Sequence, residues 1–333
     1  MNSIPFPQLL HAFFHDWLVQ QRNVSHHTVL SYRDSWRLFL RFVAAQKSKS
    51  VAKLGLNDLT AVEVLTFLQD IEEVRKASIG TRNCRLSALH SFFSFVAGRE
   101  PLAAAQCASV LRIPSKQAPQ TEVCYLEEEE ITAILAQPDR ARAEGQRDHV
   151  LLAVLYNTGA RIQEALNLSP QAFRLESPFQ VRLLGKGRKE RICPLWPETV
   201  DLVKALLKRK PCAEQDRIFV NRYGRPLNAA GVRFKLKHYV AAAAKKVPSL
   251  AQKHVSPHSF RHATAVSLVR AEVDVTVIRS WLGHASLDTT NIYARADVET
   301  KRKALEKVDG RTRPDKPTRW KREVKLLDWL DSL

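Results

Sequence analysis

The 333-residue chain has no long uninterrupted run of apolar residues and no closely paired cysteines. A membrane-spanning helix needs about 18 or more consecutive apolar residues, so the sequence predicts no transmembrane segment. Met1 to Leu10 lacks the basic start and the long apolar stretch of a secretory signal, and we expect a cytoplasmic protein. The five cysteines are scattered and odd in number, without any C-x-x-C pair, which is typical of a reducing compartment and indicates no zinc cluster.

Acidic residues are also in short supply. The chain has 34 Asp and Glu against 52 Lys and Arg, which gives a formal net charge of +18. Such an excess causes self-repulsion unless a polyanion is bound, so nucleic acid is the first partner to consider and an anionic membrane surface the second. A merely basic protein is the remaining alternative. The few carboxylates do not cluster as a two-metal nuclease requires, and we expect neither a metal nor a cofactor.

What the sequence does have is helical periodicity. Ser25 stands where an N-cap is expected, and apolar residues follow at helical spacing from Val29 to Val43. Two more amphipathic runs cover Leu59 to Ile71 and Ser78 to Val96, whose aromatic residues we expect to pack in a core. Near its start the last run also carries three candidate DNA contacts, Arg82, Asn83 and Arg85.

The pattern changes from about Gly98 to Glu122, where three prolines occur without a periodic run, and we interpret this stretch as a linker between domains. A second helical region begins at Leu126. Farther on, Phe179 to Leu184 and Glu190 to Leu195 alternate like two strands around a Gly-Lys-Gly turn. The sequence therefore predicts a mainly α-helical protein with a small β-sheet.

Two of the patterns that could carry chemistry depend on a basic side chain at a chain reversal. Arg161 follows a glycine break and opens a helix, where a cation is unfavourable for the helix dipole unless an anion binds there. An exposed arginine with a solvated head is the alternative. Lys186 lies at the tip of the predicted hairpin, either as a solvated turn or as a lysine carried to DNA, and it does not fit a phosphate-binding Walker loop.

The other two patterns contain histidines. His258 and Arg261 are three residues apart and therefore share one face of a helix, although a structural histidine at a helix start is the alternative. His258 and His262 have the spacing of a zinc pair, but Ser259 stands where a zincin has its glutamate. The last pattern is His284 with Tyr293 nine residues later. Together these groups favour phosphoryl transfer to a protein nucleophile.

In their order and spacing, these residues resemble the tyrosine recombinases, the family of phage integrases and Xer-type recombinases. The resemblance covers about Glu122 to Asp297 and is most specific between His284 and Tyr293. It implies a mixed α/β catalytic domain over residues 122–303, and a helical core-binding (SAM-like) domain that clamps DNA over residues 1–105. Residues 106–121 would then form the linker and residues 304–333 a basic tail.

The resemblance also implies a role for each residue. Tyr293 would attack a DNA phosphate and form a 3′-phosphotyrosyl intermediate, while Arg161 and Arg261 neutralise the phosphate oxygens. Lys186 would protonate the leaving 5′ oxygen, and His258 would assist proton movement at the tyrosine. His284 would hydrogen-bond the phosphate, and Arg188 and Lys189 would contact DNA. Glu164 would orient the arginines, with a surface carboxylate as the alternative.

The expected partner is double-stranded DNA with paired inverted-repeat sites, bound by a homotetramer with or without accessory or partner recombinases. Integration, excision, resolution and transposition of a mobile element would all use these residues. A type IB topoisomerase and a non-catalytic DNA-binding relative are the alternatives. In the tail, Trp320, Val324, Leu327 and Leu330 form one apolar stripe, which predicts a short helix that docks on its own catalytic domain or on a neighbouring protomer.

Overall fold

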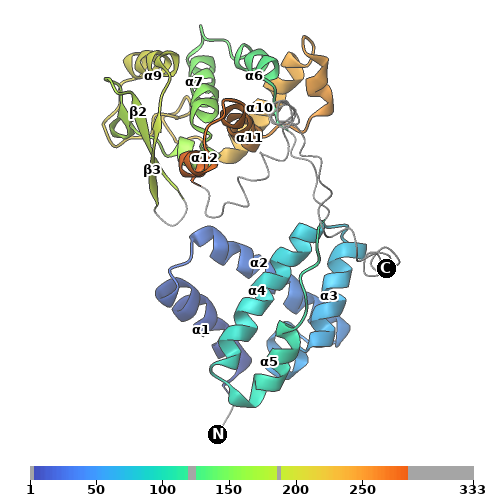
Figure 1. The fold of residues 1–333 in the computed structure, drawn as a ribbon. Coiled ribbons are helices and arrows are strands. Elements are labelled where there is room, and N and C mark those ends of the chain that lie inside the picture. Colours follow the sequence, from blue (N-terminus) through green and yellow to red (C-terminus); the bar gives the residue numbers. More distant parts are fainter. Residues whose placement is uncertain (1–3, 119–124, 186–188, 284–333) are drawn as a thin grey trace, which may run out of the picture. The chain divides into compact units, whose positions relative to one another are not determined.

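The computed structural model describes residues 4–118, 125–185 and 189–283 (Figure 1). The chain divides into two compact units, Met1–Thr121 and Glu122–Leu333. Each unit buries a separate set of apolar side chains, so each has a hydrophobic core of its own. None of the helices in these described ranges is long and apolar enough to cross a membrane.

The first unit is helical throughout its described part, as the sequence predicts. Its main elements are α1 (Phe6–Ala12), which continues into a π-helical segment (Phe13–Gln21), α2 (His26–Gln46), α3 (Ala61–Glu73), α4 (Ile79–Ala97) and α5 (Ala104–Leu111). Ser25 caps α2 by accepting a hydrogen bond from the Thr28 amide, and Ser78 caps α4 in the same way. Both expected helix starts are therefore confirmed.

Aromatic side chains fill the core of this unit. Trp36 of α2 and Phe92 of α4 are both fully buried, with ring centroids 4.5 Å apart in an edge-to-face contact. Phe13 packs edge-on against the same Phe92, so the π-helical segment is held on the α2–α4 pair. The expectation that these aromatics serve the core is confirmed.

The first unit extends farther along the chain than expected, because residues 106–111 belong to α5 and not to a linker. Cys107 and Val110 are fully buried in the aromatic core, and the Gln106 side chain donates to the carbonyls of Leu56 and Leu59 at 2.7 and 3.1 Å. Helix α5 has only eight residues and two buried positions, which is too short for a periodic pattern to stand out. The prolines at its two sides suggested a loop instead.

The second unit combines helices with one small sheet. Its helices are α6 (Glu128–Leu135), α7 (Ala143–Thr158), α8 (Ile162–Leu166), α9 (Pro197–Arg209), α10 (Ala229–Ala243), α11 (Pro257–Arg270) and α12 (Val275–Leu282). The antiparallel sheet has the order β1 (Phe173–Arg174), β2 (Gln180–Leu184) and β3 (Glu190–Pro194). The predicted hairpin is confirmed as β2 and β3, whereas β1 is too short to leave an alternating pattern.

Helix α7 is the centre of the second unit. Val150, Leu152 and Leu155 are almost completely buried although they lie on different sides of the helix, because α9 and α11 both pack against it. Figure 1 shows the β2–β3 hairpin and α9 together on one side of this unit, with α12 next to β3. The C-terminal end of α7 leads directly to Arg161.

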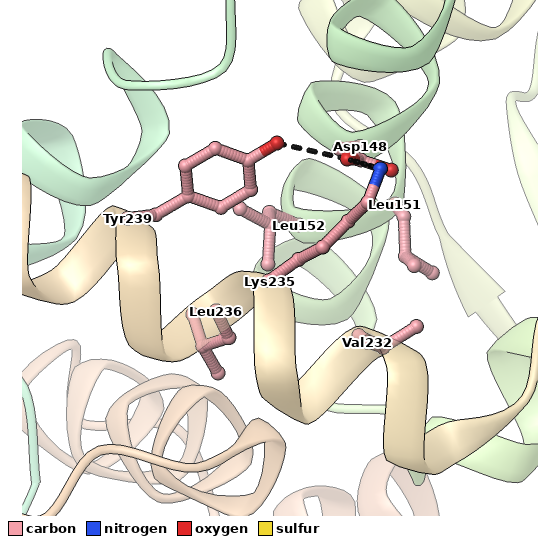
Figure 2. Close-up of a pocket in the computed structure, with 7 residues that line it drawn as sticks. All are labelled: Asp148, Leu151, Leu152, Val232, Lys235, Leu236 and Tyr239. Atoms are coloured by element: carbon pink, nitrogen blue, oxygen red, sulfur yellow. Dashed lines mark hydrogen bonds and ion pairs between the residues drawn. The ribbon is translucent and has the colours of Figure 1, made fainter.

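A buried polar cluster ties α10 to the other half of α7 (Figure 2). The Asp148 carboxylate accepts hydrogen bonds from Arg147, from Lys235 at 2.9 Å and from the Tyr239 hydroxyl at 2.8 Å. Burial and the charge of Asp148 both raise the pKa of the Tyr239 phenol. The side chains of Arg147 and Asp148 are each about 6% exposed, so their charges depend on each other.

Removing the carboxylate should therefore destabilise the second unit strongly. We expect Asp148→Ala to leave Arg147 buried without its anion and to lower the free energy of unfolding by about 3 kcal/mol or more. Calorimetry of the full chain, wild type against variant, measures the change. Glu144→Gln is the matched control, because this exposed partner of Lys235 should contribute less than about 1 kcal/mol. Equal effects of the two substitutions would contradict the assignment.

Candidate active site

The site begins where α7 ends. Gly159 closes α7 in a left-handed conformation with φ +59°, and a Cβ atom at this position would lie 2.6 Å from a methyl group of Leu282. A larger residue would be strained in backbone and side chain alike. The chain then turns sharply, and Arg161 becomes the N-cap residue of α8. The glycine break predicted before Arg161 and the helix predicted after it are both present.

Glu164 holds Arg161 in place at this turn. One carboxylate oxygen accepts from the Arg161 backbone amide at 3.0 Å, and the other accepts from the guanidinium at 2.8 Å. The Glu164 side chain is only 5% exposed, which excludes a surface carboxylate, whereas the side chain of Arg161 is 37% exposed. The arginine is thus fixed at its base and open to solvent on one side.

Arg261 of α11 approaches the same place from another element. Its guanidinium donates to the carbonyl of Gly159 at 2.7 Å and to the carbonyl of Leu282 at 2.6 Å. Arg161 donates to the next carbonyl along the chain, that of the α12 C-cap residue Gly283, at 3.5 Å. The two arginines therefore converge on the C-terminal end of α12, where the helix carries partial negative charge.

His258 lies one turn before Arg261 on α11 and is exposed. Neighbouring protein atoms remove part of its hydration and lower the pKa of the imidazole, and the positive charges of Arg261, Arg161 and Arg233 lower it further. The lowered pKa favours the neutral form of the ring, which can accept a proton. The sequence spacing correctly predicted that His258 and Arg261 lie on one helix.

Four of the predicted site residues lie outside the described residues: Lys186, Arg188, His284 and Tyr293. The residues next to them are described. Gly185 donates to the Lys189 carbonyl at 2.8 Å and closes the base of the β2–β3 hairpin, where Lys189 itself is exposed. Gly283 ends α12 with φ +65°. The apolar stripe from Trp320 to Leu330 is likewise outside the described part of the chain.

The three candidate DNA contacts of the first unit have internal partners. Arg82 is 4% exposed and donates to the Pro114 carbonyl at 2.9 Å, and Asn83 exchanges hydrogen bonds with the backbone of Lys116. Arg85 donates to the Ser35 hydroxyl at 2.9 Å. Arg82 and Asn83 thus hold the segment that leaves the first unit, and DNA contact by the three side chains stays a prediction.

Sequence reasoning missed one charged residue of the site, Arg191 of β3. Its guanidinium donates to Glu164 at 2.6 Å and to the Trp281 carbonyl at 2.9 Å. Side chains alternate between the two faces of a strand, so Arg191 shares its face with Cys193 and not with Ile192. Placing Cys193 in the core would therefore have placed Arg191 on the inner face as well. The hydrophobic pattern alone would have placed Ile192 inside. Among residues 4–118, 125–185 and 189–283 no group of three or more His, Cys, Asp or Glu side chains could hold a metal ion.

Two family models match the chain, one in each unit. A model of the phage integrase family matches residues 124–300, and a model of the phage integrase N-terminal SAM-like domain matches residues 11–100. The protein y4rC of Sinorhizobium fredii, described as an integrase/recombinase, is 38% identical over 98% of this chain and 97% of its own length. The tyrosine recombinase XerC of Pelobacter propionicus is 29% identical over 90% of this chain and 95% of its own.

Two solved structures share the fold. The XerH site-specific recombinase bound to its palindromic difH substrate, in a post-cleavage complex, has a TM-score of 0.68 and 22% identity, covering 86% of this chain and 82% of its own. The Tn1549 transposon integrase in complex with transposon right-end DNA has a TM-score of 0.65 and 17% identity, covering 92% of this chain and all of its own. At these identities the likeness establishes the fold.

The environment of His258 makes its titration testable. We expect its imidazole resonance in NMR to titrate below pH 6.5, because the neutral form is favoured by lost hydration and by three arginine charges. Arg233→Gln should move the midpoint upward by removing one of these charges. Lys237→Gln on the same helix should leave it unchanged, and His258→Gln assigns the resonance. A midpoint above 6.5 in the free protein would contradict the proposed electrostatics.

Proposed function

The chain belongs to the phage integrase family and is a tyrosine recombinase that acts in site-specific DNA recombination, and we propose that Tyr293 is its nucleophile. The phenol oxygen of Tyr293 forms a bond to a DNA phosphorus, and the bond from that phosphorus to the 5′ oxygen breaks. The 3′-phosphotyrosyl bond retains the energy of the broken diester, so the 5′ hydroxyl of a partner strand can reverse the reaction without ATP.

The proposal assigns charge stabilisation to the two arginines. Arg161 and Arg261 lie on separate elements, and their guanidinium groups donate to the adjacent carbonyls of Gly283 and Leu282. Two fixed cations side by side suit the nonbridging oxygens of a phosphate as negative charge develops on them. This convergence is the observation that carries the assignment of the site.

Proton movement falls to the remaining groups. A free tyrosine has a pKa near 10, so it needs a proton acceptor at neutral pH, and the neutral imidazole of His258 suits that role. Lys186, next to the closed base of the β2–β3 hairpin, gives a proton to the leaving 5′ oxygen. His284, which follows the C-cap residue of α12, hydrogen-bonds the phosphate, and Arg188 and Lys189 contact DNA.

The division of labour along the chain follows from these roles. The first unit clamps DNA as the core-binding domain, residues 122–303 cut and rejoin it, and the tail from residue 304 docks through its apolar stripe. The substrate is double-stranded DNA with paired inverted-repeat sites, held by four protomers. The net charge of +18 supports a polyanionic partner. Because the substrate is cellular DNA, the proposed place of action is the cytoplasm.

The nucleophile can be tested by trapping. We expect the wild-type chain to accumulate a covalent adduct on a nicked suicide substrate in a denaturing gel, and Tyr293→Phe to bind the same DNA without forming any adduct. Tyr239→Phe is the control and should still form the adduct. It removes a phenol that donates to Asp148 and whose raised pKa makes it a poor nucleophile. An adduct with Tyr293→Phe would refute the assignment, and supercoil relaxation without recombinant products would favour a topoisomerase.

The proposed chemistry uses side chains alone. We therefore expect adduct formation to proceed at the same rate with and without excess EDTA. Loss of cleavage in EDTA that magnesium restores would overturn this mechanism. Gel shifts in the same buffers provide the control, because they separate an effect on DNA binding from an effect on cleavage.

A further inference from the structure

Strand β3 contains an inversion of polarity at Arg191. The arginine side chain is 9% exposed, whereas the next residue, Ile192, is 60% exposed. Arg191 lies opposite Leu183 of β2, which is fully buried, so the register directs the charged residue toward the interior. Replacing a whole buried ion pair by well-packed hydrocarbon is often neutral for stability, so the pair of Arg191 with Glu164 is weak evidence for a purely stabilising role. The contacts of Arg191 indicate what else the inversion serves.

The contacts of Arg191 connect three segments of the site. It donates to one oxygen of Glu164, whose other oxygen holds Arg161, so a single carboxylate bridges two arginines. It also donates to the carbonyl of Trp281 in the last turn of α12. The rigid fork of a guanidinium can hold both acceptors at a fixed distance from each other.

Two glycines pack against the same side chain. A Cβ atom at Gly283 would lie 3.1 Å from Cδ of Arg191, and one at Gly185 would lie 3.6 Å from its Nη1 and 3.2 Å from Glu164. Gly185 is the residue before Lys186, and Gly283 is the residue before His284. The Arg191 side chain thus lies beside the backbone at the residue before Lys186 and at the residue before His284.

We propose that Arg191 is a positioning residue for strand cleavage, which fixes the backbone at Gly185 and Gly283 relative to Glu164 and Arg161. The proposal rests on the proposed function, in which Lys186 protonates the leaving oxygen. Arg191 itself does not touch DNA. It sets the direction in which the chain leaves each glycine, and a misplacement of about 1 Å at the reacting groups can slow an enzyme about 100-fold.

The test compares two leaving groups. Suicide substrates carry either the natural 5′ oxygen or a 5′ sulfur at the scissile bond, and a thiol with a pKa near 8.5 leaves as the thiolate without being protonated. With the oxygen substrate, we expect Arg191→Met to cleave about 100-fold more slowly while binding DNA as tightly as the wild type. With the sulfur substrate, it should recover at least about tenfold relative to the wild type.

Two further variants control for charge and for folding. Arg182→Met removes an exposed arginine from the neighbouring strand β2 and should cleave both substrates at the wild-type rate. Arg191→Lys keeps a cation beside Glu164 but loses the fork, and it should fold, cleave the oxygen substrate at an intermediate rate and respond to sulfur. If Arg191→Met does not fold, Arg191→Lys carries the test, and wild-type cleavage by this variant would overturn the proposal.

The same two substrates distinguish the proposed role of Lys186 from the proposed role of Arg191. Sulfur should also rescue Lys186→Ala, and a failure there would contradict the proposed role of Lys186 itself. If sulfur rescues Lys186→Ala but leaves Arg191→Met slow, Arg191 does not position the lysine and the inference falls, while the proposed function stands. A merely structural defect would slow both substrates equally.

Discussion

The candidate site is organised around one buried carboxylate, that of Glu164. Glu164 lies between the guanidinium groups of Arg161 and Arg191 and also caps α8 through the Arg161 amide. Burial alone would raise the pKa of Glu164, but the hydrogen bond and charge of Arg191, with help from Arg161, hold it below the ordinary value of 4.5. Because the pKa is depressed in the folded state, the stabilisation is complete above about pH 4.5 and is lost as the pH falls through the lowered pKa. Without this anion, the positive charges of Arg161 and Arg191 would repel each other with no negative charge between them.

The C-terminal end of α12 also stabilises the positive charges of the arginines. Three consecutive carbonyls, those of Trp281, Leu282 and Gly283, accept hydrogen bonds from Arg191, Arg261 and Arg161 in turn. A helix C-terminus carries only about half an elementary charge, so it orients arginines without neutralising them. A guanidinium also has five donors, more than these contacts use for Arg161. The arrangement fixes where the cations lie, while the side chain of Arg161 stays 37% exposed.

Local signals explain most of what the sequence predicted. The structure contains the cap at Ser25, the helix after Ser78, the alternation of β2 and β3 and the shared helix of His258 and Arg261. Each of these depends on residues within one or two turns of each other. The partners that were missed are distant in sequence. Arg191 meets Trp281 across 90 positions, and Asp148 meets Tyr239 across 91. Periodicity contains no information about such distant pairs. Helix α5 was missed because it is short, with only two buried residues to form a pattern.

The positions of the glycines suggest how rigidity is distributed in the site. The two arginines proposed to stabilise the phosphate charge lie on helices: Arg161 at the capped start of α8 and Arg261 within the buried α11. Hydrogen bonds to Glu164 hold Arg161, and a hydrogen bond to the Gly159 carbonyl holds Arg261. The proposed proton donor Lys186 and the proposed phosphate ligand His284 follow glycines instead, at Gly185 and Gly283. A glycine contributes no side chain that could hold the following segment, so its direction must be set by a neighbour. Arg191 packs against both glycines, and a single side chain can therefore align two segments that are far apart in the sequence.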